Sequence, residues 1–194
     1  MPRPIAVTLL AWSVAFIACQ PGRREAGGKD ERPGAAQDTQ TAASGGSITA
    51  PMRDRDGKDL GTLTLTEDAQ GISIAGPMAG LPPGPHGIHL HTVGRCDPPG
   101  FESAGDHWNP TNRQHGTQSP QGPHLGDLPN LTVSKDRSVA VQSTTPGGTL
   151  RGANALLDSD GSAVVVHAKR DDYRTQPSGN SGDRLACGVV AGSR

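Results

Sequence analysis

Six of the seven histidines of this 194-residue chain lie between His86 and Asp127, a stretch that makes up only about a fifth of its length. The stretch begins HGIHLH and continues through GDHWNPTNRQHG to GPHLGD. In a strand, side chains at i and i+2 point to the same face, so His89 and His91 present two imidazoles side by side. The segment that follows has about 40 residues without an expected strand, a length that is uncommon for a loop unless something fixes it. The fold must therefore hold a long histidine-bearing loop against a short strand.

This loop carries a set of side chains that could bind a metal ion. His107, His115, His124 and Asp127 follow one another at separations of eight, nine and three residues. Three imidazoles and a carboxylate form a closed tetrahedral set that suits Zn²⁺, and a bound ion would fix the loop. His167, near the end of AVVVHA, could turn inward and join the strand pair. From the residues alone, the alternative is that the strand pair is solvated or hydrogen-bonded.

Short alternating segments after residue 46 predict an all-β domain. Leu63 and Leu65 alternate with threonines, and Ile72 and Ile74 flank Ser73. The chain has 27 glycines and 17 prolines, and its helix formers never gather at helical spacing. We expect an antiparallel sandwich or barrel, in which residues 152–157 form a helical turn or a strand. Further strands are expected at residues 88–93, 131–133, 138–142, 163–168 and 185–190.

The N-terminus predicts export. Arg3 precedes an uncharged apolar run from Ile5 to Ala18, which is too short to span a membrane and has the length of a signal-peptide core. Residues 1–18 are therefore expected to be an export signal peptide, with a buried helix as the alternative. The residues before Cys19 read FIA, and this resembles a bacterial lipobox. Lipidation of Cys19 is expected, with ordinary cleavage nearby as the alternative.

Residues 19–46 are expected to form a lipidated cysteine followed by a disordered tether, because the segment after Cys19 is small, charged and free of large apolar side chains. This predicts an exported protein of the periplasm or cell envelope, held to a membrane only through its lipid. The net charge is -1, with no block of like charge and few aromatic residues. Nucleic acid is therefore not an expected partner.

The sequence from about residue 47 to 194 resembles the Cu/Zn superoxide dismutases. The segments HGIHLH, GDHWNPTNRQHG, PHLGD, VVHAKRDD and GNSGDRLACGV occur in the order and at the spacing of that family. The resemblance implies an eight-stranded antiparallel Greek-key β-barrel or sandwich with long metal-binding and electrostatic loops. It also implies one copper and one zinc per chain.

Position by position, the resemblance implies two metal sites that share one histidine. Copper would be bound by His89, His91, His107 and His167. Zinc would be bound by His107, His115, His124 and Asp127. His107 would bridge the two ions as an imidazolate.

Other matched positions have implied roles outside the ligand sets. Asp171 would link His89 to His115, and Arg184 would sit beside the copper and attract a small anion. Lipidation of Cys19 would leave Cys96 and Cys187, which match the family's intrasubunit disulfide.

Several nearby residues are given less specific roles. His86 lies three residues before His89 and is expected to be a hydrogen-bonded, structural histidine. Asp172 is expected to be a surface charge. Asn130 begins a glycosylation pattern that is interpreted as a chance match. Lys169, Arg170 and Arg174 could assist Arg184 in steering the substrate.

The implied activity is the dismutation of superoxide in two steps. Superoxide reduces copper and leaves as dioxygen, then a second superoxide reoxidises copper and leaves as hydrogen peroxide with a proton from His107. The alternative is a non-catalytic copper-binding or copper-delivering lipoprotein on the same fold, against which Arg184 argues because a carrier needs no anion guide. A zinc-stabilised structural domain is a third possibility, and the complete copper set argues against it. Assembly as a homodimer is left open.

Overall fold

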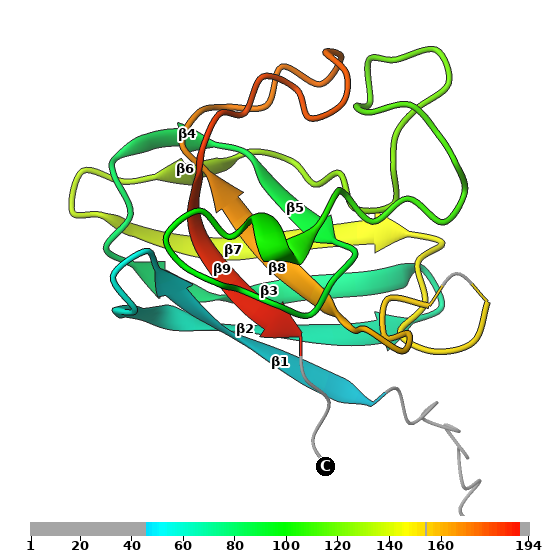
Figure 1. Ribbon diagram of the computed structural model, residues 1–194, viewed down its shortest axis with the longest axis horizontal. Helices are drawn as coiled ribbons and strands as arrows, with labels where there is room; N and C mark the ends of the chain where they lie inside the picture. The colour runs from blue at the N-terminus through cyan, green and yellow to red at the C-terminus, as the bar shows by residue number, and fades with distance from the viewer. Residues whose placement is uncertain (1–45, 154, 191–194) are drawn as a thin grey trace, which may run out of the picture. The chain divides into compact units, whose positions relative to one another are not determined.

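The computed structural model describes residues 46–153 and 155–190. The expected signal peptide at 1–18, the lipidation site at Cys19 and the tether up to residue 45 lie outside the described residues. Within them, the chain consists of nine strands and one short 3-10 helix (Figure 1). No helix in this described part is long and apolar enough to cross a membrane.

The elements follow one another from Ser47 to Val190. They are β1 (Ser47–Asp54), β2 (Asp59–Asp68), β3 (Gly71–Ala79), β4 (Gly84–His86), β5 (Ile88–His91), η1 (Glu102–Ala104), β6 (Leu131–Val133), β7 (Ser138–Pro146), β8 (Ser162–His167) and β9 (Arg184–Val190).

Seven strands form one sheet in the order β5-β8-β9-β1-β2-β3-β7, and β4 pairs with β6. All of these pairings are antiparallel. Because β7 lies beside β3 and β9 beside β1, long connections join the strands, as in Greek-key folds. The predicted all-β antiparallel class is confirmed. The described chain has nine strands where eight were expected, and its shortest segments, β4 and β6, have only three residues each.

The core follows from the alternation in β2 and β3. Leu63, Leu65, Ile72 and Ile74 are fully buried, and Leu65 lies opposite Ile74 in the sheet. Burial of each such side chain contributes roughly 1.5–3 kcal/mol. The threonines between the leucines of β2 face outward. The period of two therefore selects which face of the sheet becomes the core.

Some boundaries differ from those predicted. The strand expected at 88–93 ends at His91, and the strand expected at 138–142 continues to Pro146. The extension arises because β7 pairs with β3 along its whole length, as far as Gly71 opposite Pro146. The described part of 152–157 is neither helix nor strand, and Ala155 makes one isolated bridge to Thr149.

Backbone pairing and a disulfide fix the long loop after β5. The Leu90 N–H donates to the Gly126 carbonyl at 2.9 Å, and the Trp108 N–H donates to the Leu90 carbonyl at 2.8 Å. The predicted disulfide between Cys96 and Cys187 is confirmed, with a Cα–Cα distance of 5.7 Å. It ties the same loop to β9, so the loop is fixed at two places without any metal.

Candidate metal centre

Four imidazoles from three parts of the chain converge at one point. His89 and His91 lie on β5, His107 in the following loop, and His167 at the end of β8. One nitrogen from each ring lies within 4.8 Å of the others. These nitrogens, Nδ1 of His89 and Nε2 of the other three, are buried and have no hydrogen-bond partner. Because an unpartnered buried polar atom costs free energy, this convergence indicates a metal site.

The second nitrogen of most of these rings is already engaged. Nδ1 of His91 donates to the Gly105 carbonyl at 2.9 Å, and Nδ1 of His167 donates to the Gly182 carbonyl at 3.1 Å. A neutral imidazole that donates from one nitrogen has a lone pair on the other. These bonds therefore aim the lone pairs at the common point.

A second cluster forms around Asp127. Its Oδ1 lies 2.9 Å from Nδ1 of His107, 3.0 Å from Nδ1 of His115 and 3.3 Å from Nδ1 of His124. Its Oδ2 accepts the backbone N–H groups of Gly116 and His124 at 2.7 and 3.0 Å. Ligands of a tetrahedral zinc ion lie about 3.3 Å apart, so the three distances from Oδ1 of Asp127 are close to those of a zinc site.

His107 belongs to both clusters. Its Nε2 is among the unpartnered nitrogens of the first cluster, and its Nδ1 faces Asp127 in the second. Its ring centroid is 4.0 Å from that of His89. One imidazole thus separates the two candidate sites.

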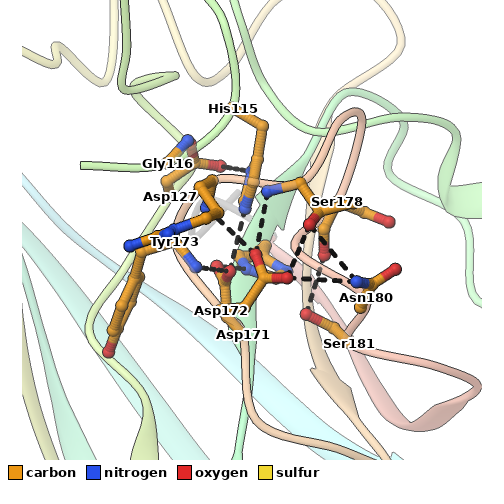
Figure 2. A network of polar contacts seen from close by, with 12 residues as sticks. His115, Gly116, Asp127, Asp171, Asp172, Tyr173, Ser178, Asn180 and Ser181 are labelled. Carbon is orange, nitrogen blue, oxygen red and sulfur yellow. Dashed lines mark hydrogen bonds and ion pairs between the residues drawn. The ribbon is translucent and has the colours of Figure 1, made fainter. Parts of the chain in front are cut away.

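Asp171 connects the two clusters, and Figure 2 shows it together with His115. Its Oδ2 lies 2.9 Å from Nε2 of His89, and its Oδ1 lies 2.9 Å from Nε2 of His115. Its backbone is clamped by Asn130, whose Oδ1 accepts the Asp171 N–H at 2.7 Å and whose Nδ2 donates to the Asp171 carbonyl at 2.9 Å. The amide of Asn130 is therefore used inside the fold, consistent with a chance glycosylation match.

Two further residues that the sequence did not single out shape this region. Gln176 clamps the backbone of His115: its Oε1 accepts the His115 N–H at 2.8 Å and its Nε2 donates to the His115 carbonyl at 3.0 Å. Gly179 has a φ of 67°, and a Cβ there would lie 1.8 Å from Oδ1 of Asp171. Gly179 is the first residue of the segment GNSGDRLACG. A glycine at the start of this segment was the one sequence signal for a left-handed backbone there.

Asp172 lies at the surface, as expected, and its carboxylate also bonds to the loop around it. Its carboxylate accepts the N–H and hydroxyl of Thr175 at 2.8 and 2.6 Å, and the amide of Asn180 at 3.1 Å (Figure 2). The bonds from Thr175 lower its pKa to about 2. Asp172 thus organises the loop that carries Asp171.

His86 has the structural role predicted for it. It is 3% exposed, and its ring nitrogens lie 2.7 Å from the His167 carbonyl and 2.8 Å from the Pro82 carbonyl. It belongs to neither candidate metal cluster of the described residues.

Arg184 faces the open side of the first cluster. It lines a cavity of about 930 Å³ together with His91, His107 and His167. Its guanidinium donates to the carbonyls of Phe101 and Gly105 at 2.7 and 2.8 Å. These bonds hold a permanent positive charge at the cavity wall.

The other cationic residues considered for steering the substrate lie outside the cavity lining. Lys169, Arg170 and Arg174 do not line this cavity, and Arg174 bonds to the side chain of Gln118. Arg184 is the one cationic residue among the described residues that line the cavity.

Burial and the carboxylates set the charge states of the rings. Burial, reinforced by the neighbouring histidines, lowers the pKa of His107 to about 4 and that of His167 to about 3. Burial also opposes protonation of His115, but its bonds to Asp127 and Asp171 outweigh this and raise its pKa to about 9. The same bonds hold the pKa of both carboxyl groups below the usual range despite their burial. Neutral His107 and His167 are thus available as ligands near neutral pH.

Comparisons with known proteins place this geometry in a family. The family model of copper/zinc superoxide dismutase (SODC) matches residues 60–190. The chain belongs to the copper/zinc superoxide dismutase family. Members of this family use copper and zinc, and the two clusters of this superoxide dismutase homologue could bind them.

Some relatives of this chain are named superoxide dismutase, and others are named superoxide dismutase-like protein. The "Superoxide dismutase [Cu-Zn]" of Caulobacter vibrioides is 43% identical over 148 residues, which cover 74% of this chain and 85% of the relative. The "Superoxide dismutase-like protein YojM" of Bacillus subtilis is 42% identical over 158 residues, covering 79% and 80%.

Solved structures agree with the fold. The Cu/Zn superoxide dismutase from Brucella abortus superimposes with a TM-score of 0.62 at 30% identity, covering 75% of this chain and 99% of that one. A superoxide dismutase-like protein from Bacillus subtilis gives 0.71 at 41% identity, covering 74% and 97%.

Proposed function

We propose that this protein dismutates superoxide to dioxygen and hydrogen peroxide. The observation that carries the proposal is the convergence of four unpartnered imidazole nitrogens beside Arg184 in the wall of one cavity. Family membership supports the proposal but does not by itself establish turnover, because relatives of similar identity are named either dismutase or dismutase-like.

The two clusters fit different metals. We assign copper to His89, His91, His107 and His167, because an all-imidazole set suits copper. We assign zinc to the three Nδ1 atoms around Asp127, since a set of three imidazoles and a carboxylate suits zinc. Copper supplies one-electron redox chemistry when bound, whereas zinc has none and acts structurally and electrostatically.

Arg184 binds the substrate anion in this proposal. Its two carbonyl bonds fix the guanidinium plane, and the remaining N–H groups are available to an anion in the cavity. Because the charge is permanent and prepositioned, superoxide is held beside the first cluster without any rearrangement.

His107 supplies a proton. Two superoxide ions and two protons yield one dioxygen and one hydrogen peroxide, so protons must reach the buried cavity. With Nδ1 held in the second cluster, His107 can carry a proton on Nε2, the nitrogen that belongs to the first cluster, and release it to the product. We propose that this ring bridges the two metals as an imidazolate when the proton is absent.

A matched pair of histidine variants tests the proposal. His167→Gln removes one of the four converging nitrogens, and we expect it to lose copper affinity and superoxide-removing activity. His86→Gln is the control for the loss of a buried imidazole outside both clusters, and because His86 bonds to the His167 carbonyl, we expect it to cause a smaller loss than His167→Gln. Activity that survives His167→Gln would overturn the proposal, and copper binding without turnover by the unmodified protein would favour the non-catalytic copper-binding alternative.

We also propose that the protein is exported and anchored by a lipid on Cys19. The support is the sequence alone: an apolar run of signal-peptide length followed by a lipobox-like motif. Fatty-acid labelling and membrane fractionation of the intact chain and of Cys19→Ser test it. Equal labelling and equal membrane retention of the two proteins would refute the anchor.

A further inference from the structure

The cavity above the first cluster carries more negative than positive side chains. Its lining includes Asp106 and Asp158 but only Arg184 as a cation, among the residues that the structure describes. A cavity that must admit an anion is expected to favour positive charge, because a local field of the opposite sign raises the on-rate. The two carboxylates therefore need an explanation.

Asp106 lies in the wall of this cavity, next to a residue of the first cluster. It directly precedes His107, and its carbonyl accepts the Thr92 N–H at 3.0 Å. Its side chain is exposed, and within the described chain its carboxylate makes no hydrogen bond or ion pair. The charge is therefore not neutralised by a close partner.

Asp106 and Arg184 also lie close enough to influence each other. The guanidinium of Arg184 donates to the carbonyl of Gly105, the residue before Asp106. Burial lowers the pKa of Arg184, and the negative charges of Glu102 and Asp106 oppose that decrease. The field that an incoming anion meets is thus the guanidinium charge reduced by these carboxylates.

We infer that Asp106 is a residue of the cavity wall that opposes the access of anions to the cavity, and that Asp158 acts in the same direction. The inference rests on the proposed function for its substrate. A single unit charge about 8–10 Å away in water changes the local concentration of a monovalent anion about twofold. The low-dielectric cavity walls focus the field, so a twofold to threefold effect is the order of magnitude expected.

The first test measures the kcat/KM for superoxide of the full chain loaded with copper and zinc. We expect Asp106→Asn to raise it about twofold to threefold at an ionic strength of about 0.01 M, with the difference vanishing at about 0.3 M because salt screens exposed charges. Asp106→Glu keeps the charge and should match the unmodified protein. Asp158→Asn should give an increase of the same sign.

The matched control is Asp56→Asn. Asp56 is an exposed aspartate in the turn between β1 and β2 and does not line the cavity. The control changes the net charge by the same amount, so an effect of total charge would appear in both variants. Equal rates for Asp106→Asn and Asp56→Asn, or an effect of Asp106→Asn that does not depend on salt, would overturn the inference.

A second readout does not depend on turnover. Azide, a small monovalent anion, is titrated into the copper-loaded proteins and its dissociation constant is read from the visible absorption of copper. We expect Asp106→Asn to bind azide about twofold to threefold more tightly at low salt, and Asp56→Asn to bind it unchanged. Absent turnover would contradict the proposed function, whereas unchanged azide affinity in Asp106→Asn would contradict this inference alone.

Discussion

The Asp171 carboxylate lies 2.9 Å from Nε2 of His89, and both side chains are completely buried. Its other oxygen is equally close to Nε2 of His115, so one carboxylate orients a ring of each cluster. Asp171→Asn keeps the shape of the side chain but replaces one carboxylate oxygen with an NH₂ group. That group would face the Nε2–H of His89 or His115, so two donors would meet. We expect zinc affinity to fall about 10-fold to 100-fold, as for other residues that orient metal ligands. Competition with a chromophoric chelator measures this, and unchanged affinity would show that Asp171 does not orient the rings.

Gln176 provides a second, more exposed support for His115. Gln176→Ala removes both bonds to the His115 backbone. Each such bond contributes about 1 kcal/mol, so we expect zinc affinity to fall by up to about 30-fold, with copper affinity less affected. Gln142→Ala is the control, because Gln142 is exposed on β7. A loss of both metal affinities by the same factor would indicate general destabilisation instead.

The metal-free protein should lose stability on both sides of about pH 6.5. The folded-state pKa values of His107 and His167, about 4 and about 3, lie below the ordinary 6.5. The unfolded chain therefore binds more protons than the folded chain below pH 6.5. As the pH falls from 6.5 to about 3, the free energy of unfolding decreases by on the order of a few kcal/mol.

His115 acts in the opposite direction. Its folded-state pKa is raised to about 9, so its contribution is fully present below 6.5 and is lost as the pH rises through 9. Thermal melts of chelator-treated protein across this range check both slopes. His167→Gln should flatten the acid side, and an unchanged acid slope would contradict the assignment to the buried histidines.

The disulfide should contribute strongly to stability. It joins cysteines 91 residues apart, and closing a loop of this length stabilises by roughly 4–5 kcal/mol in the chain-entropy model. Urea unfolding with and without a reductant measures the loss. The Cys96→Ser, Cys187→Ser double variant should match the reduced protein and not respond to reductant, and a reductant effect in that variant would point to another cause.

The sequence predicted the parts of the molecule that local pattern determines. The period of two in β2 and β3 identified the core face, and the spacing of HLH placed His89 and His91 on one strand. The place of His167 near the end of AVVVHA suggested that it could join this pair, and the family motifs implied its ligand role and the linking role of Asp171.

The roles of the clamping amides were not visible in the sequence. Asn130 and Asp171 are 41 residues apart, and Gln176 and His115 are 61 apart. An asparagine or a glutamine in a polar loop has no local signature, because its role depends on which distant backbone the fold brings to it. The acidic lining at Asp106 and Asp158 depends likewise on two loops meeting at one cavity.

The most direct test is the rate at which the full chain, loaded with one copper and one zinc, removes superoxide in pulse radiolysis. We expect catalytic removal with a kcat/KM on the order of 10⁸–10⁹ M⁻¹s⁻¹, and a marked loss in Arg184→Ala with both metals retained. Full occupancy of both metals without catalytic removal of superoxide would contradict the account.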